Sequence, residues 1–245
     1  ITNKCVLLLF FSNRLFMIIR IQYGCANVIQ SQYSIEKVWT DNKTWVGANP
    51  LITNTILKNT LEKKLFAPLK NVTLTHQEVV TGDSRIDFKG KDTTGNIVYL
   101  EVKNVPLTDY HVSQIPSDRK VLYSIQEKKK YKKVAVFPYG SAKLKDNMVS
   151  PRAYKHLLTL EKLSAQPKTR AILVYIIPRS DCQGLLPNYV KDPKYANKVY
   201  DTIENTKVEI YAISYKWIGD KMYFDKKLPI ISPKKYYSYG KLKKN

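Results

Sequence analysis

Two segments of alternating apolar and polar residues, 84–88 and 99–103, flank a turn near the middle of the chain, and no other feature constrains the fold as strongly. The turn at 92–96 contains the Gly and Asn that favour a hairpin reversal. Alternation predicts two strands, with Ile86 and Phe88 on one face of the first strand and the acidic residue between them on the other. The chain is therefore expected to build a sheet around this hairpin.

Pairing of the two strands is expected to bring Asp87, Glu101 and Lys103 together on one face. Two clustered carboxylates can hold a hard cation such as Mg²⁺, with Mn²⁺ as a substitute, and a neighbouring lysine can orient a water for attack on a phosphodiester. The backbone carbonyl of Val102 is a further candidate metal ligand. An acid followed after thirteen residues by Glu-Val-Lys is typical of PD-(D/E)XK nucleases. A solvated hairpin face with a Glu-to-Lys pair is the alternative, and the spacing alone favours it.

The chain carries a large excess of positive charge, with 41 Lys and Arg against 20 Asp and Glu and a net charge of +21. Only a minority of these charges can be paired within the fold, so a polyanion such as DNA is the expected partner. Lys-rich composition is also what an AT-rich genome produces. Composition therefore supports nucleic-acid binding but does not establish it.

The first 24 residues contain two apolar runs, 5–11 and 15–19. They predict two strands. A secretory signal peptide is the alternative, although the apolar core is short and no small-residue cleavage site follows promptly. No uninterrupted run reaches the roughly 20 residues of a membrane span. Three widely spaced cysteines without a Cys-x-x-Cys pair fit a reducing compartment and disfavour a zinc site. We therefore expect an intracellular protein, cytoplasmic or nuclear.

The other elements predict an α+β protein. Residues 29–46 are typical of a second hairpin, and a helix is expected after a Thr53-Asn54 cap, with Leu57, Leu61 and Leu65 on its inner face. The run 171–177 is short and continuously apolar, as in a central strand covered on both faces. Further strands are expected at 74–80, 208–215 and 222–224, one helix from Ser150-Pro151 onward, and another up to residue 205 with Tyr195, Val199 and Ile203 inward.

Basic residues gather at 120–133, where tyrosines are interleaved with lysines. A solvated basic face and a surface that follows a nucleic-acid backbone explain such a run equally well. The candidate DNA-binding residues are Arg85, Lys128, Lys129, Lys130, Arg152, Lys155 and His156.

Several motifs together resemble the sugar fermentation stimulation protein family, SfsA. They are Ser-Arg-Ile-Asp-Phe at 84–88, Tyr-Leu-Glu-Val-Lys-Asn at 99–104, Phe137-Pro138, Arg152-x-x-Lys155-His156-Leu157 and Arg170-Ala171. The match covers about residues 30 to 231. The resemblance implies an OB-like β domain followed by a PD-(D/E)XK nuclease-like domain with a mixed sheet and flanking helices. It also implies DNA binding without strong sequence preference and a link to the regulation of sugar catabolism. Asp87, Glu101 and Lys103 correspond to the nuclease-like triad, and Arg152, Lys155 and His156 to a basic helix.

The chain departs from the family pattern in three places. The His-Cys-Pro-Asn-Thr-Gly segment of the OB-like domain is absent, Tyr139 follows Phe-Pro where the family has Asp, and the position of a usual helix acid falls on Asn59, with Glu62 one turn on. We expect a partial OB-like β domain at 1–50, a nuclease-like domain at 51–231 and a basic tail at 232–245.

Two functions follow from these observations. The first is a sequence-nonspecific DNA-binding protein, which both the charge and the resemblance favour. The second is a divalent-metal-dependent DNA nuclease that uses Asp87, Glu101 and Lys103. A third interpretation is that residues 1–28 come from a wrongly assigned start and that the remaining chain is a decayed copy.

Overall fold

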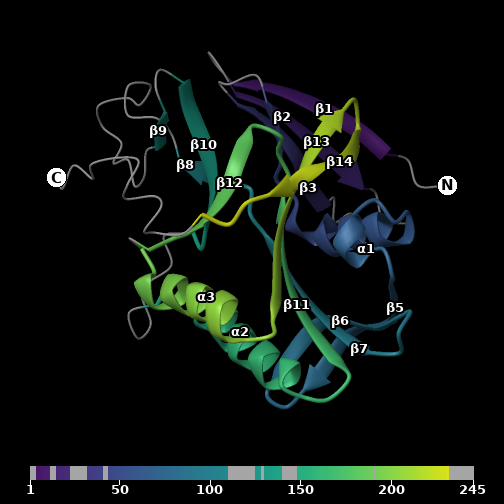
Figure 1. The fold of residues 1–245 in the computed structure, drawn as a ribbon. Helices are drawn as coiled ribbons and strands as arrows, with labels where there is room; N and C mark the ends of the chain where they lie inside the picture. Colours follow the sequence, from purple (N-terminus) through teal and green to yellow (C-terminus); the bar gives the residue numbers. More distant parts are fainter. Residues whose placement is uncertain are drawn as a thin grey trace.

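The computed structural model describes residues 4–11, 15–22, 32–40, 44–109, 125–127, 130–139, 148–189 and 191–231. A central six-stranded sheet carries helices on both faces (Figure 1). In spatial order its strands are β14 (Lys221–Leu228), β13 (Glu209–Ile218), β11 (Thr169–Ile177), β7 (Ile97–Asn104), β6 (Ser84–Asp92) and β5 (Val72–Thr81). The three middle strands, β13, β11 and β7, are parallel, and the outer pairs are antiparallel. This confirms the predicted α+β class, with a mixed sheet and flanking helices.

The two faces of the central sheet hold separate hydrophobic cores. Helix α1 (Thr53–Glu62) packs on one face, and α2 (Pro151–Ser164) and α3 (Pro193–Asn205) pack together on the other (Figure 1). Strand β11 contributes alternate residues to both cores, and seven consecutive residues of it, 171–177, are buried. The continuous apolar run is therefore the central strand that the sequence predicted. Among the described residues, no helix is long and apolar enough to cross a membrane.

Two smaller sheets complete the described structure. One has the order β12-β10-β8, with β9 also paired to β10, and the other contains the four N-terminal strands in chain order. Their bounds are β8 (Thr108–Asp109), β9 (Ile125–Glu127), β10 (Lys130–Phe137), β12 (Cys182–Pro187), β1 (Lys4–Phe11), β2 (Leu15–Gln22), β3 (Gln32–Thr40) and β4 (Thr44–Gly47). Both predicted N-terminal hairpins are present. The OB-like character of 1–50 stays a prediction, and the tail at 232–245 lies outside the described residues.

Lys37 of β3 joins the N-terminal sheet to the central one. Its ammonium is buried, donates to the carbonyl of Gly219 at 2.6 Å and to Asp220 at 3.3 Å, and lies over the rings of Trp45 and Trp217. A lysine so deeply buried needs these partners, because a charge without them is costly to remove from water. This contact ties β3 to the turn between β13 and β14.

Two helix predictions were wrong in detail. Helix α1 ends at Glu62, so Leu65 lies beyond it and is 47% exposed. In α3 the inner face carries Thr202 in place of Ile203, which is 42% exposed. The first error comes from expecting the helix to continue past Glu62. The second comes from a strict four-residue step, because the true period of 3.6 residues has rotated Ile203 away from the core.

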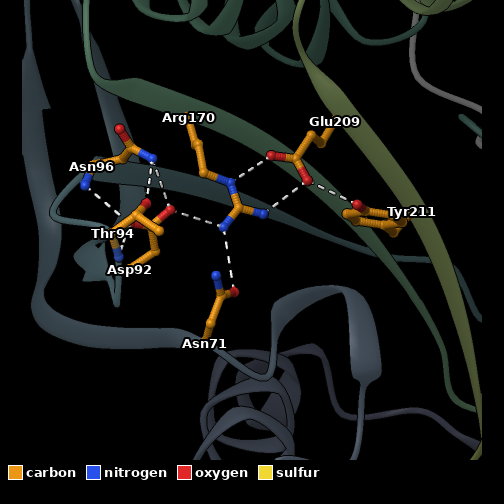
Figure 2. A network of polar contacts seen from close by, with 7 residues as sticks. All are labelled: Asn71, Asp92, Thr94, Asn96, Arg170, Glu209 and Tyr211. Carbon is orange, nitrogen blue, oxygen red and sulfur yellow. Dashed lines mark hydrogen bonds and ion pairs between the residues drawn. The ribbon is translucent and has the colours of Figure 1, made fainter.

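At one end of the central sheet, Arg170 of β11 links three strands through a polar network (Figure 2). Its guanidinium makes two bonds to Glu209, at 2.7 and 2.9 Å, and one to Asp92 at 3.3 Å. Asp92 in turn accepts bonds from Thr94 and Asn96 in the hairpin turn. Burial acts to raise the pKa of Asp92, but these bonds outweigh it and hold that pKa far below its ordinary value. The network fixes the β6–β7 hairpin against β11 and β13.

We expect Arg170→Met to lower the free energy of unfolding by about 2 to 4 kcal/mol, because it leaves Glu209 without its bidentate partner in a part-buried position. Urea denaturation measures this. Arg152→Met removes an exposed arginine from α2 and serves as the control, with an expected change below about 0.5 kcal/mol. Equal stability of the two variants would contradict a structural role for the network.

Candidate functional site

Strands β6 and β7 part at Asp87. Their ladder ends at the Phe88–Leu100 pair, and beyond it the carboxylate of Asp87 accepts a bond from the backbone N–H of Val102 at 2.7 Å. A second bond, at 3.2 Å, comes from the side-chain amide of Asn54 on α1. The side-chain carboxylate of Asp87 therefore accepts the N–H of β7 in place of a backbone carbonyl of β6, and it lies between helix α1 and strand β7.

This divergence corrects the predicted alternation. Ile86 packs in the core under α2, whereas Phe88 packs in the core under α1, so the two side chains lie on opposite faces. The reason is a local break in the ladder at Asp87. On the other side of β6, Glu78 stands between the partners of Ile86 and Phe88 and has a left-handed backbone, with φ of 54°. A regular strand pattern does not survive there.

Glu101 of β7 lies on the α2 face and is 2% exposed. One of its oxygens, Oε1, contacts both the ammonium of Lys103 and the Nδ1 atom of His156 from α2. The ammonium and Nδ1 are 3.3 Å apart. The predicted pairing of Glu101 with Lys103 is thus present, and a histidine joins it.

The second oxygen of Glu101 has no such contact. In the described part of the chain, Oε2 is buried and lacks a hydrogen-bond partner. A buried carboxylate oxygen without a donor is costly, and native structures reserve such groups for a special role or for an ion. The unpaired Oε2 therefore makes this carboxylate a candidate ligand for an ion.

The charges of the site act in opposite directions on its two acids. Burial and, next, the negative charge of Glu101 raise the pKa of Asp87 above its ordinary value, against the bonds from Val102 and Asn54. Burial acts the same way on Glu101, but the bond from His156 and the charge of Lys103 outweigh it, so the pKa of Glu101 is lowered. The two carboxylates are close enough to repel each other, and a cation between them would remove this repulsion.

The residues present fit a divalent cation with few protein ligands. No cluster of three His, Cys, Asp or Glu suited to a metal exists among the described residues. Mg²⁺ nevertheless commonly binds through one or two carboxylates and keeps several waters. Asp87 and the unpaired oxygen of Glu101 are the acids that could hold such an ion. The carbonyl of Val102 points to the same strand edge as its N–H, which is bonded to Asp87.

The structure separates the predicted DNA-binding residues. Arg85 is exposed and pairs with Glu78 at 2.6 Å, and Lys155 is exposed and donates to the carbonyl of Asp83 at 2.7 Å. Arg152 is exposed in the first turn of α2. His156 is only 4% exposed, so the prediction that it contacts DNA is wrong: its ring is turned inward to Glu101. Lys128, Lys129 and the side chain of Lys130 lie outside what the structure describes.

Sequence reasoning missed the role of two residues. It treated Asn54 as part of a helix cap, but α1 has no side-chain cap bond and Asn54 donates to Asp87 instead. It grouped His156 with its basic neighbours on the helix. A sequence signal existed for His156 alone: it stands three residues after Ala153 and four before Leu160, which are both on the inner face of α2.

The family model for the sugar fermentation stimulation protein RE domain matches residues 51–117 and 128–221. The chain belongs to this family. The match includes Asp87, Glu101, Lys103 and His156, and it begins where the expected second domain begins.

Individual SfsA proteins agree with this membership. A sugar fermentation stimulation protein homologue of Nostoc punctiforme is 32% identical over 178 residues, which are 70% of this chain and 60% of that protein. The homologue of Rippkaea orientalis is 30% identical over 66% of this chain and 56% of its own length. The chain thus spans well under two thirds of these relatives. The structure of Pyrococcus furiosus SfsA in complex with Ca²⁺ aligns with a TM-score of 0.64 and 19% identity, over 88% of this chain and 78% of that one. This likeness shows the shared fold.

Proposed function

We propose that this SfsA-family chain binds DNA through phosphate contacts, without strong sequence preference. The supporting observation is the arrangement of helix α2 within a chain of net charge +21. Arg152 is exposed in the first turn of this helix, and His156, one turn later, contacts Glu101 of the carboxylate site. An exposed basic side chain and a residue of the carboxylate site thus belong to the same helix. The same proposal places the protein inside the cell and links it, through the family name, to sugar metabolism.

A second candidate function is divalent-metal-dependent DNA cleavage at Asp87, Glu101 and Lys103. The unpaired, buried Oε2 of Glu101 favours it, because DNA binding alone gives this oxygen no role. Asp87 and Glu101 would hold Mg²⁺ or Mn²⁺, which polarises a phosphodiester and lowers the pKa of a bound water. Lys103 would orient the attacking water. The calcium in the Pyrococcus furiosus structure supports a divalent ion as a proposal for this chain.

One experiment separates the two functions. The protein is incubated with supercoiled plasmid and with single-stranded DNA, in EDTA and with Mg²⁺ or Mn²⁺. We expect binding in EDTA and, with the metals, slow nicking of the plasmid. Binding without nicking supports the first function alone, and cleavage in EDTA contradicts the second.

Asn54 offers a direct test of the proposed metal site. We expect Asn54→Asp to tighten Mn²⁺ binding by about tenfold, because it adds a third carboxylate beside Asp87, and cation affinity rises with ligand charge. Isothermal calorimetry measures the affinity. Thr55→Asp adds a carboxylate on the exposed side of α1 and is the control, with no expected effect. Tighter binding in the control but not in Asn54→Asp would contradict the placement of the ion.

A further inference from the structure

His156 is a buried titratable side chain in contact with the site, and the proposed chemistry leaves it without a task. It is enclosed between α2 and the sheet, and its Nδ1 atom meets Oε1 of Glu101. Since it is buried, it cannot be a phosphate ligand on the surface. Its role must pass through the groups that it touches, which are Glu101 and Lys103.

The chemistry of the three groups fixes the direction of the hydrogen bonds. An ammonium has only donors, and an ionised carboxylate has only acceptors. Oε1 of Glu101 contacts the ammonium of Lys103, so it is the acceptor of that contact. We therefore assign the proton of His156 to Nδ1, so that the histidine and Lys103 both donate to Oε1. The 3.3 Å separation of Nδ1 from the ammonium is then the approach of two donors to one acceptor, not a bond between them.

The ammonium of Lys103 has three donors and can contact both Glu101 and a water, but by itself it does not fix the orientation of the carboxylate. The lysine stem has four rotatable carbons and its ammonium is a mobile point charge, whereas the imidazole of His156 is a rigid ring packed in the core. When the ammonium of Lys103 turns to a water, another donor must remain on Oε1 of Glu101. Without one, the buried carboxylate can rotate and present either oxygen to the cation. His156 supplies that donor.

We propose that His156 is a positioning residue that holds Oε1 of Glu101, so that Oε2 stays available to a divalent cation while Lys103 is left to act on the nucleophile. This inference rests on the proposed divalent site. It differs from a purely structural role because it ties the histidine to one oxygen of one carboxylate.

Two substitutions test it, with Mn²⁺ affinity measured by calorimetry. His156→Leu fills the same core space without a donor, and we expect Mn²⁺ binding to weaken about 10- to 100-fold, the usual cost of losing an outer hydrogen bond to a metal ligand. His156→Asn places an amide N–H where Nδ1 stands, and we expect affinity within about threefold of the wild type. Both variants should bind DNA in EDTA as the wild type does, because the side chain makes no surface contact.

The outcomes distinguish this inference from the function on which it rests. If the wild type binds no Mn²⁺, the divalent site itself is wrong. If the wild type binds Mn²⁺ and His156→Leu binds it equally well, the positioning role is wrong. Thermal melting checks folding, and if His156→Leu does not fold, His156→Asn still decides: retained affinity supports the role of the donor, and a tenfold loss overturns it.

Discussion

Raising the salt concentration from about 50 to about 200 mM is expected to weaken DNA binding about 10³- to 10⁴-fold. The reason is counterion release: if about five to eight lysines and arginines contact phosphates, the log–log slope of affinity against salt is about −5 to −7 on duplex DNA. Fluorescence anisotropy with a labelled duplex in EDTA measures this slope. The chain has enough charge for such a footprint, with 41 basic residues against 20 acidic ones.

A pair of substitutions at Lys155, which is exposed on α2, refines the salt experiment. Lys155→Ala is expected to reduce the slope by about 1 if its ammonium contacts a phosphate, and Lys155→Arg, which keeps the charge, is expected to leave it unchanged. A wild-type slope shallower than about −2 would contradict binding through phosphates.

Lys103→Ala is expected to reduce divalent-dependent nicking of plasmid DNA by at least about 100-fold, the range associated with loss of a positioned proton-transfer group. DNA affinity in EDTA should change by less than about 1 kcal/mol, because one lysine among many contributes little to phosphate binding. The side chain is only 15% exposed and lies against Glu101, so it has little surface to offer DNA. Nicking assays and anisotropy on the same preparation give both values.

Two further variants complete this test. Asp87→Asn should also abolish nicking, yet leave metal-free DNA binding unchanged or slightly tighter, because it removes a carboxylate that repels phosphate. Lys207→Ala is the control. It removes an exposed lysine two residues before β13, at the end of the sheet that carries the Arg170 network, and this variant should nick DNA normally. Nicking that persists in purified Lys103→Ala protein, or that needs no metal, would rule out the proposed site.

Much of the fold could be predicted because its strongest signals are local. The apolar run at 171–177 has the length and composition of a buried central strand, and it is one. The Gly and Asn at 95 and 96 mark the hairpin turn that the structure contains. Leu65 was misplaced because helix ends depend on tertiary packing, and Ile203 because a fixed four-residue step drifts from the helical period.

The site was harder to predict because its geometry depends on an irregularity. Strand alternation places Asp87 and Glu101 on one face, but the break in the ladder turns Asp87 toward the backbone of β7. The pairing of Glu101 with Lys103 survives because both stand on one regular strand. Asn54 and His156 reach the site from two different helices, and their contacts follow from how α1 and α2 pack across the sheet. No spacing within a single segment encodes such contacts.

The most direct test of the central claim is the affinity of the full chain for two unrelated duplexes of equal length, measured in EDTA at low salt. A protein that binds phosphates without reading bases should bind both, with dissociation constants within about threefold of each other. Absence of binding to both duplexes, or an affinity more than about 100-fold higher for one of them, would contradict the claim.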